Sequence, residues 1–345
     1  MSEPGERRSA MSGPLAGPDE AQVERKSANF QLLAGRGHSA HDELEFWHGN
    51  IGQAVALDLA SPAEAPIQEI DLLCWNVAIG RAFLDELFAR LRQGDFGPIG
   101  TDPSRPFVLL LQEVYRADPS VPEHVRDRFH GGHVPLGTRR DIVSFAADHN
   151  LSLRYMPSMR NGQHRSDRGN AILANVAIRD AHGFTLPYVR QRRVVVNAEL
   201  DGVPGLTFAS AHLDTSGRLR GKAIWTSFSG GRAAQVRELV GRLHELGSDR
   251  SFIIGADLNT AIGIRDPAFL VLHRAGFLRA AGSEKIRHTF HGPVRMLLDH
   301  VLYHSENGAV ERVEVIRLDE TPADRDARVF GSDHHPLLAR IRLRT

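Results

Sequence analysis

Residues 251–259 read SFIIGADLN, an apolar run of strand length that ends in the polar side chains of Asp257 and Asn259. Its length and the flanking turn signals predict a β-strand. The two polar residues are two positions apart on an extended segment, so their side chains point to the same side and can bracket one water or one phosphate oxygen. The stretch therefore predicts a strand that delivers polar groups to one edge of a β-sheet.

Further apolar runs of similar length predict more than one sheet. They are IDLLCWNV (70–77), FVLLLQEV (107–114), NAILAN (170–175), RVVVNAEL (193–200), LTFASAHL (206–213), MLLDHVLY (296–303), RVEVIRL (312–318) and LLARIRLR (337–344). Stretches with helical periodicity lie between some of them, at 81–93, 138–150 and 231–247, and Gly247 is placed as a helix stop. Continuously apolar runs are typical of strands covered by helices, and alternating runs of strands that pair directly. The pattern predicts two packed sheets with helices on their outer faces.

Residues 1–45 differ in composition from the rest of the chain. They are rich in Gly, Pro, Ser, Glu and Arg, with scattered apolar side chains. Such a segment buries too little surface to offset its ordering entropy, so we expect a disordered N-terminal tail. No repeat and no linker divides the remainder, and residues 46–345 are predicted to form one domain.

The overall charge is balanced, with 42 Lys and Arg against 42 Asp and Glu. Nothing in this balance steers the protein to nucleic acid or to an anionic membrane, so any such binding must be local. Cys74 is the single cysteine, which excludes an internal disulfide and a cysteine-built zinc site. No apolar run reaches the roughly 18 residues of a membrane helix, and the first 30 residues have no apolar core typical of a signal peptide. We therefore expect a cytoplasmic protein without stable membrane insertion.

Polar residues follow five of the apolar runs and precede a sixth. They are Asn76; Gln112 and Glu113; His212 and Asp214; Asp257 and Asn259; Asp299 and His300; and, before the last run, Asp333 and His334. If the strands of both sheets end at a common edge, these side chains converge there. The sequence thus predicts a polar site at that edge.

The residue types in this set fit the hydrolysis of a phosphate ester. Oxygen donors from Asn76, Glu113 and Asp333 suit Mg²⁺, which takes one or two carboxylates and leaves its other positions to water and phosphate. The imidazoles of His212 and His334 can exchange protons near neutral pH. Such a set is suited to in-line attack of an activated water on phosphorus.

Seven short motifs carry a resemblance to a known family. CWN, LLLQEV, RGNAIL, SAHLD, GADLN, LDHVLY and SDHHPL occur in this order. From about residue 68 to the C-terminus the chain resembles the endonuclease/exonuclease/phosphatase (DNase I-like) superfamily, which includes nucleases, inositol polyphosphate phosphatases and bacterial sphingomyelinases. The resemblance implies an α/β fold, a four-layer sandwich of two packed mixed β-sheets flanked by helices. It also implies a Mg²⁺-dependent site at one edge, in which Mn²⁺ can substitute.

The resemblance implies a role for individual residues as well. His334 corresponds to the general base or its equivalent, oriented by Asp299. Whether His334 or Asp257 deprotonates the water is left open. The catalytic positions implied in this way are His212, Asp257, Asn259, Asp299 and His334, and the metal positions are Asn76, Glu113 and Asp333.

Two stretches depart from the family pattern. GADLN carries Ala256 between the Gly and the Asp, but the Asp-x-Asn spacing is intact. The loop SMRNGQHRSDRGN (158–170) has arginines where abasic-site enzymes have an aromatic residue, which argues against abasic-site repair. Arginine at such a place suits a phosphate, through bidentate hydrogen bonds. Arg165, Arg168 and Asn170 are therefore predicted to bind the substrate.

The predicted function is a Mg²⁺-dependent phosphoesterase acting on a phosphodiester, as a nuclease or a small phosphodiesterase. Its partner is a phosphate-ester substrate: a nucleic acid, a nucleotide or a phospholipid headgroup. A sphingomyelinase-like lipid phosphodiesterase stays open, with Trp225 and Phe228 in KAIWTSFSGG as candidates for membrane contact. A phosphomonoesterase stays open too.

Two other classes of protein are disfavoured. A binding scaffold without activity would be expected to have lost a site residue, and none is missing. A zinc protein built on the 18 histidines is disfavoured because they are scattered along the chain and lack the usual ligand spacing. His335 receives no role from the resemblance.

Overall fold

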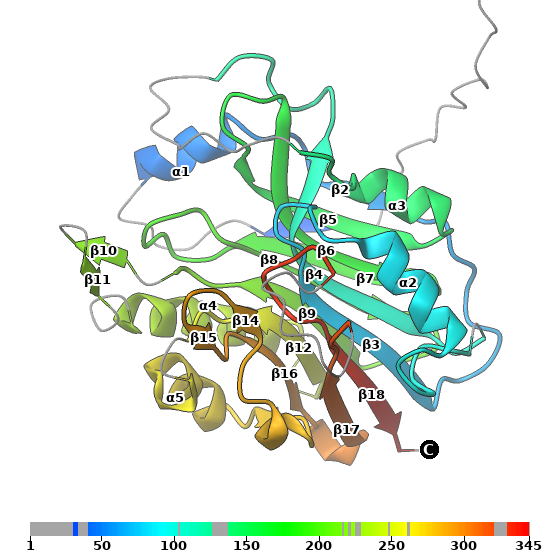
Figure 1. The fold of residues 1–345 in the computed structure, drawn as a ribbon. Helices are drawn as coiled ribbons and strands as arrows, with labels where there is room; N and C mark the ends of the chain where they lie inside the picture. Colours follow the sequence, from blue (N-terminus) through cyan, green and yellow to red (C-terminus); the bar gives the residue numbers. More distant parts are fainter. Residues whose placement is uncertain are drawn as a thin grey trace, which may run out of the picture.

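The computed structural model describes residues 30–33, 41–102, 104–125, 137–215, 217–219, 222–224, 229–247, 249–260, 263–320 and 330–344. Two seven-stranded sheets pack face to face, and helices cover the outer face of each (Figure 1). This arrangement confirms the predicted α/β sandwich.

The first sheet is mixed. Its strands, in spatial order, are β1 (Gln31–Leu33), β7 (Ile178–Thr185), β8 (Val194–Leu200), β9 (Leu206–His212), β12 (Ser251–Asp257), β16 (Asp299–His304) and β13 (Leu278–Arg279). β9 and β12 run parallel, and β16 runs antiparallel to β12. The end of β12 therefore lies beside the end of β9 and the beginning of β16.

The second sheet is also mixed. Its strands, in spatial order, are β17 (Val310–Arg317), β18 (Leu337–Leu343), β3 (Glu69–Asn76), β4 (Phe107–Ala117), β6 (Ser166–Ala174), β5 (Ser152–Arg160) and β2 (Val55–Leu57). β3 and β4 run parallel, and β18 runs antiparallel to β3. The start of β18 consequently lies beside the end of β3.

Helices and short hairpins complete the fold. The helices are α1 (His41–His48), α2 (Leu84–Gln93), α3 (Ile142–Asp148), α4 (Ser229–Glu245) and α5 (Pro267–Arg274), with 3-10 turns at Gly263–Arg265, Ser283–Lys285 and Glu306–Gly308. Two hairpins are formed by β10 (Gly217–Leu219) with β11 (Lys222–Ile224) and by β14 (Phe290–His291) with β15 (Arg295–Met296).

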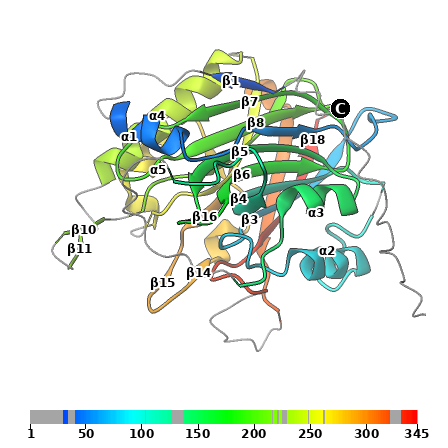
Figure 2. The same cartoon turned by 90° about the horizontal axis from the view of Figure 1, so that it is seen from above.

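Three apolar clusters hold the four layers together. One lies between the sheets and includes Leu110 and Phe208. A second joins the outer face of the second sheet to α2 and α3, and a third joins the outer face of the first sheet to α4 and α5. Figure 2 shows these two pairs of helices on opposite sides of the molecule. Burial of apolar surface on both faces explains why the central strands read as continuous apolar runs.

Local sequence signals set several helix ends. Asp141 caps α3 by accepting hydrogen bonds from the backbone of Val143 and Ser144, and Asp266 caps α5, with Pro267 in its first turn. α2 stops at Gly94, whose φ of 86° favours glycine.

Two elements of the fold lie within the segment that the sequence predicts as a tail. Residues 1–29 and 34–40 lie outside the described residues, but Gln31–Leu33 form β1 and α1 begins at His41. β1 pairs in parallel with β7, so backbone hydrogen bonds at a sheet edge order a segment whose composition indicated disorder. The predicted boundary between residues 45 and 46 falls inside α1.

Among the described residues, none of the helices combines the length and the apolar character that a membrane crossing requires. Trp225 and Phe228, the candidates for membrane contact, lie outside the described residues.

Candidate active site

The register of the first sheet places three predicted site residues in one row. Asp257 at the end of β12 is paired with His212 at the end of β9 on one side and with Asp299 at the beginning of β16 on the other. All three are buried. The sequence pattern placed Asp299 after a strand, whereas it starts one; the antiparallel direction of β16 brings it to the same edge.

The second sheet supplies the opposite wall of the site. Asn76 ends β3, and Glu113 lies within β4 at a bulge, with a φ of 52°. A bulge redirects a side chain out of the regular alternation, so Glu113 reaches the sheet edge although β4 continues past it. His334 precedes β18, and its carbonyl accepts a hydrogen bond of 2.8 Å from the Trp75 indole at the end of β3.

Asp257 is the centre of the resulting contacts. Its Oδ2 accepts a hydrogen bond of 2.9 Å from Asn76 Nδ2, and lies 3.4 Å from His212 Nε2 and 3.9 Å from His334 Nε2. Its Oδ1 accepts a hydrogen bond of 3.1 Å from the backbone N–H of Asn259. The structure thus brings together residues from both sheets around one carboxylate.

His334 carries the proton in this arrangement. Its Nδ1 lies 2.7 Å from Asp299 Oδ2. Burial alone would lower the pKa of His334, but the Asp299 carboxylate, together with Asp257, raises the pKa to about 10. The ring is therefore an imidazolium at neutral pH, oriented by Asp299.

Asp257 titrates close to neutrality. Burial and the nearby Asp299 carboxylate raise the pKa of Asp257 to about 7, against the opposing effects of His334 and the Asn76 hydrogen bond. A carboxylate of this kind binds and releases a proton in the range where a general base operates.

His212 is neutral. Burial lowers its pKa well below the ordinary value, and the charge of Arg193 lowers it further. Arg193 Nη1 lies 3.0 Å from His212 Nδ1, and a guanidinium can only donate. The His212 proton is therefore on Nε2, which faces Asp257, and the contact at 3.4 Å is a hydrogen-bonding arrangement and not an ion pair.

Arg193 is not among the site residues that the sequence predicts. It is buried just before β8, and its Nε lies 3.4 Å from Asp214 Oδ1. Asp214, whose role the sequence left open, also accepts hydrogen bonds of 3.0 and 3.3 Å from the backbone of Arg190 and Gln191. Asp214 thus positions Arg193 against His212. One signal could have identified Arg193. It immediately precedes β8, and because β8 runs antiparallel to β9, β8 begins at the edge where β9 ends.

A small hollow at this edge has walls from both sheets. Its lining includes Glu113, Arg168, Asn170, Arg193 and His212. Two cationic groups and one carboxylate meet there, a combination suited to a phosphate and a divalent cation.

Two of the predicted substrate-binding residues lie at this hollow. Arg168 donates to Asn161 Oδ1 at 3.1 Å, and Asn170 Nδ2 donates to the carbonyl of Val194 at 2.7 Å, which ties β6 to the start of β8. Arg165 does not line it: its guanidinium donates to the carbonyls of Val121 and Pro119.

The predicted metal residues differ in how the structure uses them. The Glu113 carboxylate makes no hydrogen bond to the described residues and borders the hollow. Asn76 Oδ1 accepts one hydrogen bond, from the backbone of Ala78 at 3.0 Å, and keeps a second lone pair. The Asp333 side chain is half-buried, and its backbone carbonyl accepts a hydrogen bond of 2.7 Å from His291.

Asp257, Asp299 and His334 also offer ligand atoms within 4.8 Å of one another. Asp299 Oδ2 is paired with His334, which is cationic, and Asp257 Oδ2 accepts a hydrogen bond from Asn76, while Asp299 Oδ1 has no hydrogen-bond partner among the described residues. Glu113 is the better anchor for a hard cation, because its carboxylate is uncommitted.

The Asp299–His334 pair makes stability depend on pH. The folded pKa of His334 is about 10 against an ordinary 6.5, so its contribution is fully present below pH 6.5 and is lost as pH rises through 10. We expect the destabilisation caused by His334→Gln to be largest near pH 6 and to shrink toward pH 9.5. Urea unfolding of metal-free protein measures it, with His273→Gln, at an exposed position of α5, as the control. A difference that stays constant over this range would contradict the pairing.

The two packed sheets, with acidic, amide and imidazole groups at their common edge, have the phosphoesterase fold of the DNase I-like type. The sequence profile of the endonuclease/exonuclease/phosphatase family matches residues 73–334, and the chain belongs to this family. Its members are generally hydrolases of phosphate esters that use a divalent metal.

Solved structures with the same fold include the catalytic domain of human Nocturnin with a bound sulfate anion. It is 15% identical, with a TM-score of 0.51, over 85% of this chain and 98% of that one. An endonuclease/exonuclease/phosphatase from Beutenbergia cavernae DSM 12333 is 16% identical, with a TM-score of 0.53, over 80% of this chain and 72% of that one. No curated protein matches the sequence. At this identity the likeness shows the fold alone.

Proposed function

We propose that the protein is a Mg²⁺-dependent phosphodiesterase that hydrolyses its substrate by in-line attack of water. The observation that carries the proposal is the placement of Asp257, with a pKa of about 7, between neutral His212 and cationic His334. Attack of water on a phosphate needs a base for the water proton, and it needs a hydrogen-bond donor and a positive charge for the phosphate oxygens. These three groups surround one point here.

Glu113 and Asn76 would hold Mg²⁺, with Asp333 as a further oxygen donor. The uncommitted Glu113 carboxylate and the free lone pair of Asn76 support this assignment. When bound, the ion supplies positive charge that polarises the phosphate.

Residues of the chain carry out proton transfer and stabilise charge on the phosphate. In this proposal Asp257, and not His334, accepts the proton of the attacking water; the raised pKa of Asp257 and the Asp299-held proton of His334 support that choice. His334, held by Asp299, keeps its proton and stabilises negative charge on the phosphate oxygens. In the substrate complex His212 would donate its Nε2 hydrogen, which faces Asp257 in this structure, to the phosphate oxygens. Asn259 fixes Asp257 through its backbone N–H.

The arginines at the hollow bind the phosphate in this proposal. Arg168 and Arg193 line the hollow together with Glu113. Arg165 braces the neighbouring loop and takes no part in the site.

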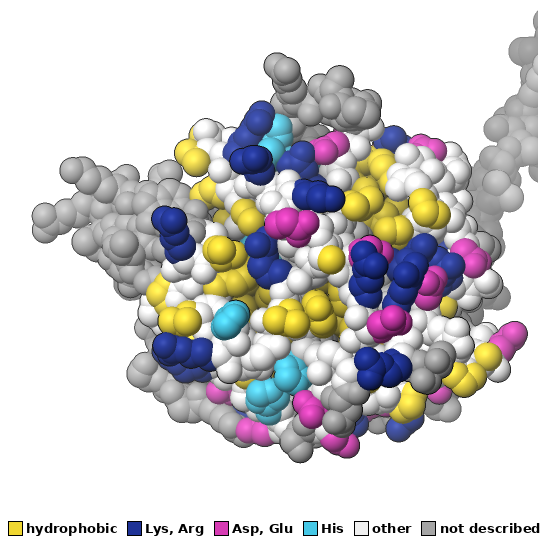
Figure 3. Space-filling model, turned by 90° about the horizontal axis from the view of Figure 1, so that it is seen from below, with side chains coloured by type: hydrophobic (Ala, Val, Ile, Leu, Met, Phe, Trp, Pro, Cys, Tyr) yellow, Lys and Arg dark blue, Asp and Glu magenta, His cyan; other side chains and the backbone are white. Residues whose placement is uncertain are grey.

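The charge on one face of the molecule supports a small diester over a long nucleic acid. On the face shown in Figure 3, Lys and Arg side chains alternate with acidic and apolar ones among the described residues. A protein surface that binds a long nucleic acid needs continuous positive charge to neutralise the phosphate backbone.

A cytoplasmic location stays a prediction from the sequence.

A substrate screen tests the proposal. Purified protein with Mg²⁺ would be assayed against bis-4-nitrophenyl phosphate, 4-nitrophenyl phosphate, plasmid DNA, RNA and sphingomyelin vesicles. We expect the small diester to be hydrolysed faster than the monoester and the polymers. Hydrolysis of the monoester alone would overturn the assignment as a diesterase, and cleavage of sphingomyelin alone would point to the lipid enzymes.

A further inference from the structure

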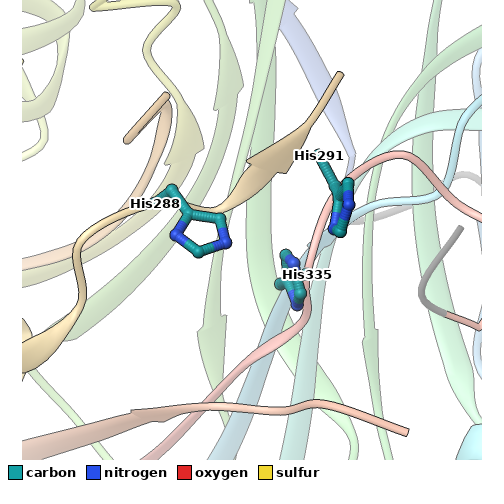
Figure 4. A group of neighbouring side chains, drawn as sticks. All are labelled: His288, His291 and His335. Carbon is teal, nitrogen blue, oxygen red and sulfur yellow. The ribbon is translucent and has the colours of Figure 1, made fainter. Parts of the chain in front are cut away.

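A second group of possible metal ligands lies beside the catalytic edge. His288, His291 and His335 offer ring nitrogens within 4.8 Å of one another. Figure 4 shows the three rings gathered around one space, two from the segment of β14 and one from the segment before β18. None of them takes part in the chemistry proposed above.

Backbone hydrogen bonds fix this grouping. The His291 N–H donates to the Asp333 carbonyl and the His335 N–H to the Thr289 carbonyl, both at 2.7 Å. An isolated antiparallel bridge joins Phe290 to His334 between them. The cluster therefore forms across two segments far apart in sequence, which is why spacing along the chain gave no sign of it.

The hydrogen bonds of His335 orient its ring in the way that is typical of a metal ligand. Its Nδ1 lies 2.8 Å from Asp319 Oδ1 and 3.2 Å from the Leu318 carbonyl, and both groups only accept hydrogen bonds. The proton is therefore on Nδ1, and Nε2 carries the lone pair. A carboxylate that holds the far nitrogen of a histidine is the usual support of a histidine ligand.

The Nε2 lone pair of His335 lacks a donor. The residue is 3% exposed, and Nε2 has no hydrogen-bond partner among the described residues. A buried polar atom left without a partner destabilises the fold unless something binds it. This atom is a second indication of a ligand, independent of the grouping of the rings.

We propose that His288, His291 and His335 bind one divalent transition-metal ion of the Zn²⁺ type. Imidazole nitrogen suits Zn²⁺ and its neighbours, whereas Mg²⁺ takes oxygen ligands. Three histidines with a fourth position open to water form a complete coordination set for Zn²⁺. The ion would fasten β14 to the segment that carries His334, and so brace the catalytic edge from outside.

Arg317 is the competing group. Its Nη1 lies 2.9 Å from His288 Nε2 and 3.0 Å from the His288 carbonyl, and its Nη2 lies 3.0 Å from Asp319 Oδ2. Binding of the ion would displace Arg317 Nη1 from the ring, whereas the bond to Asp319 is made by the other nitrogen, Nη2. Burial and the charge of Arg317 lower the pKa of His288 to about 4, so the ring has no proton to lose at neutral pH.

A path from solvent exists on this side. A hollow of about 870 Å³ is lined by His288, Arg317 and Asp319, among others. It is distinct from the small hollow that Glu113 borders, and of the three histidines His288 lines it.

Metal binding to the full-length protein tests the proposal. Chelator-stripped protein would be titrated calorimetrically with Zn²⁺ in excess Mg²⁺, which occupies the oxygen-donor site. We expect one equivalent of Zn²⁺ to bind and to raise the melting temperature. His288→Gln and His291→Gln should each weaken binding by at least about 10-fold and remove the thermal shift.

Two matched variants separate this site from others. His273→Gln removes an exposed histidine on α5, and Glu113→Gln alters the catalytic edge; both should bind Zn²⁺ as the wild type does. Binding unchanged in His288→Gln and His291→Gln, binding lost in Glu113→Gln, or no uptake by the wild type would each overturn the proposal.

Discussion

Asp257→Asn should lower the turnover of a phosphodiester by about 10²–10⁴-fold, the usual contribution of a general base. The amide keeps the size of the side chain but cannot accept the proton of the attacking water. Steady-state hydrolysis of bis-4-nitrophenyl phosphate with saturating Mg²⁺ measures the effect, and kcat should fall more than KM rises.

The matched control for this substitution lies at the other end of the same strand. Asp249→Asn makes the same chemical change at an exposed position just before β12 and should leave turnover unchanged. If Asp257→Asn keeps wild-type turnover, Asp257 is not the base. A melting temperature close to that of the wild type would show that the loss does not arise from unfolding.

Glu113→Gln should strongly weaken the response of the enzyme to Mg²⁺. Glutamine has the same shape and can occupy the same bulge, but it removes the one uncommitted carboxylate at the hollow. Loss of a cation that stabilises the phosphate by several kcal/mol corresponds to at least about 10²-fold in rate. Turnover measured as a function of Mg²⁺ concentration should fall in amplitude, and its midpoint should rise.

The control for the metal prediction is Glu86→Gln, an exposed glutamate on α2. It should reproduce the wild-type Mg²⁺ curve. A Glu113→Gln curve that matches the wild type would remove Glu113 from the metal site and leave the group of Asp257, Asp299 and His334 as the alternative.

Much of the site was predictable because strand ends are visible in sequence. His212 and Asp257 follow apolar runs that end at the same edge of parallel strands, and the register confirms that they are neighbours. The four-layer fold followed from the same runs and from the helices between them.

The residues that sequence reasoning missed or misplaced share a cause. Arg193, which the sequence did not assign to the site, stands just before β8, and Asp299, which was assigned to the site but expected after a strand, begins β16. Glu113 reaches the edge through a bulge, which a regular alternation does not reveal. Strand direction and bulges are set by tertiary pairing, so the apolar pattern of one segment does not determine them.

The tail and the histidine cluster illustrate the same limit. β1 is ordered because it pairs with β7, and the composition of a segment does not show whether the edge of a sheet is available to pair with it. His335 acquires its surroundings from Asp319 and from the β14 segment, which only the fold brings beside it.

The central claim, that this edge hydrolyses a phosphodiester with a bound divalent cation and Asp257 as the base, has one direct measurement. Wild-type protein stripped with EDTA would be assayed on bis-4-nitrophenyl phosphate before and after Mg²⁺ is restored, with Asp257→Asn in parallel. We predict no turnover before Mg²⁺ is added, turnover by the wild type afterwards, and at most about 1% of that rate in the variant. Turnover by the stripped wild type, or equal rates for the two proteins after Mg²⁺ is restored, would contradict it.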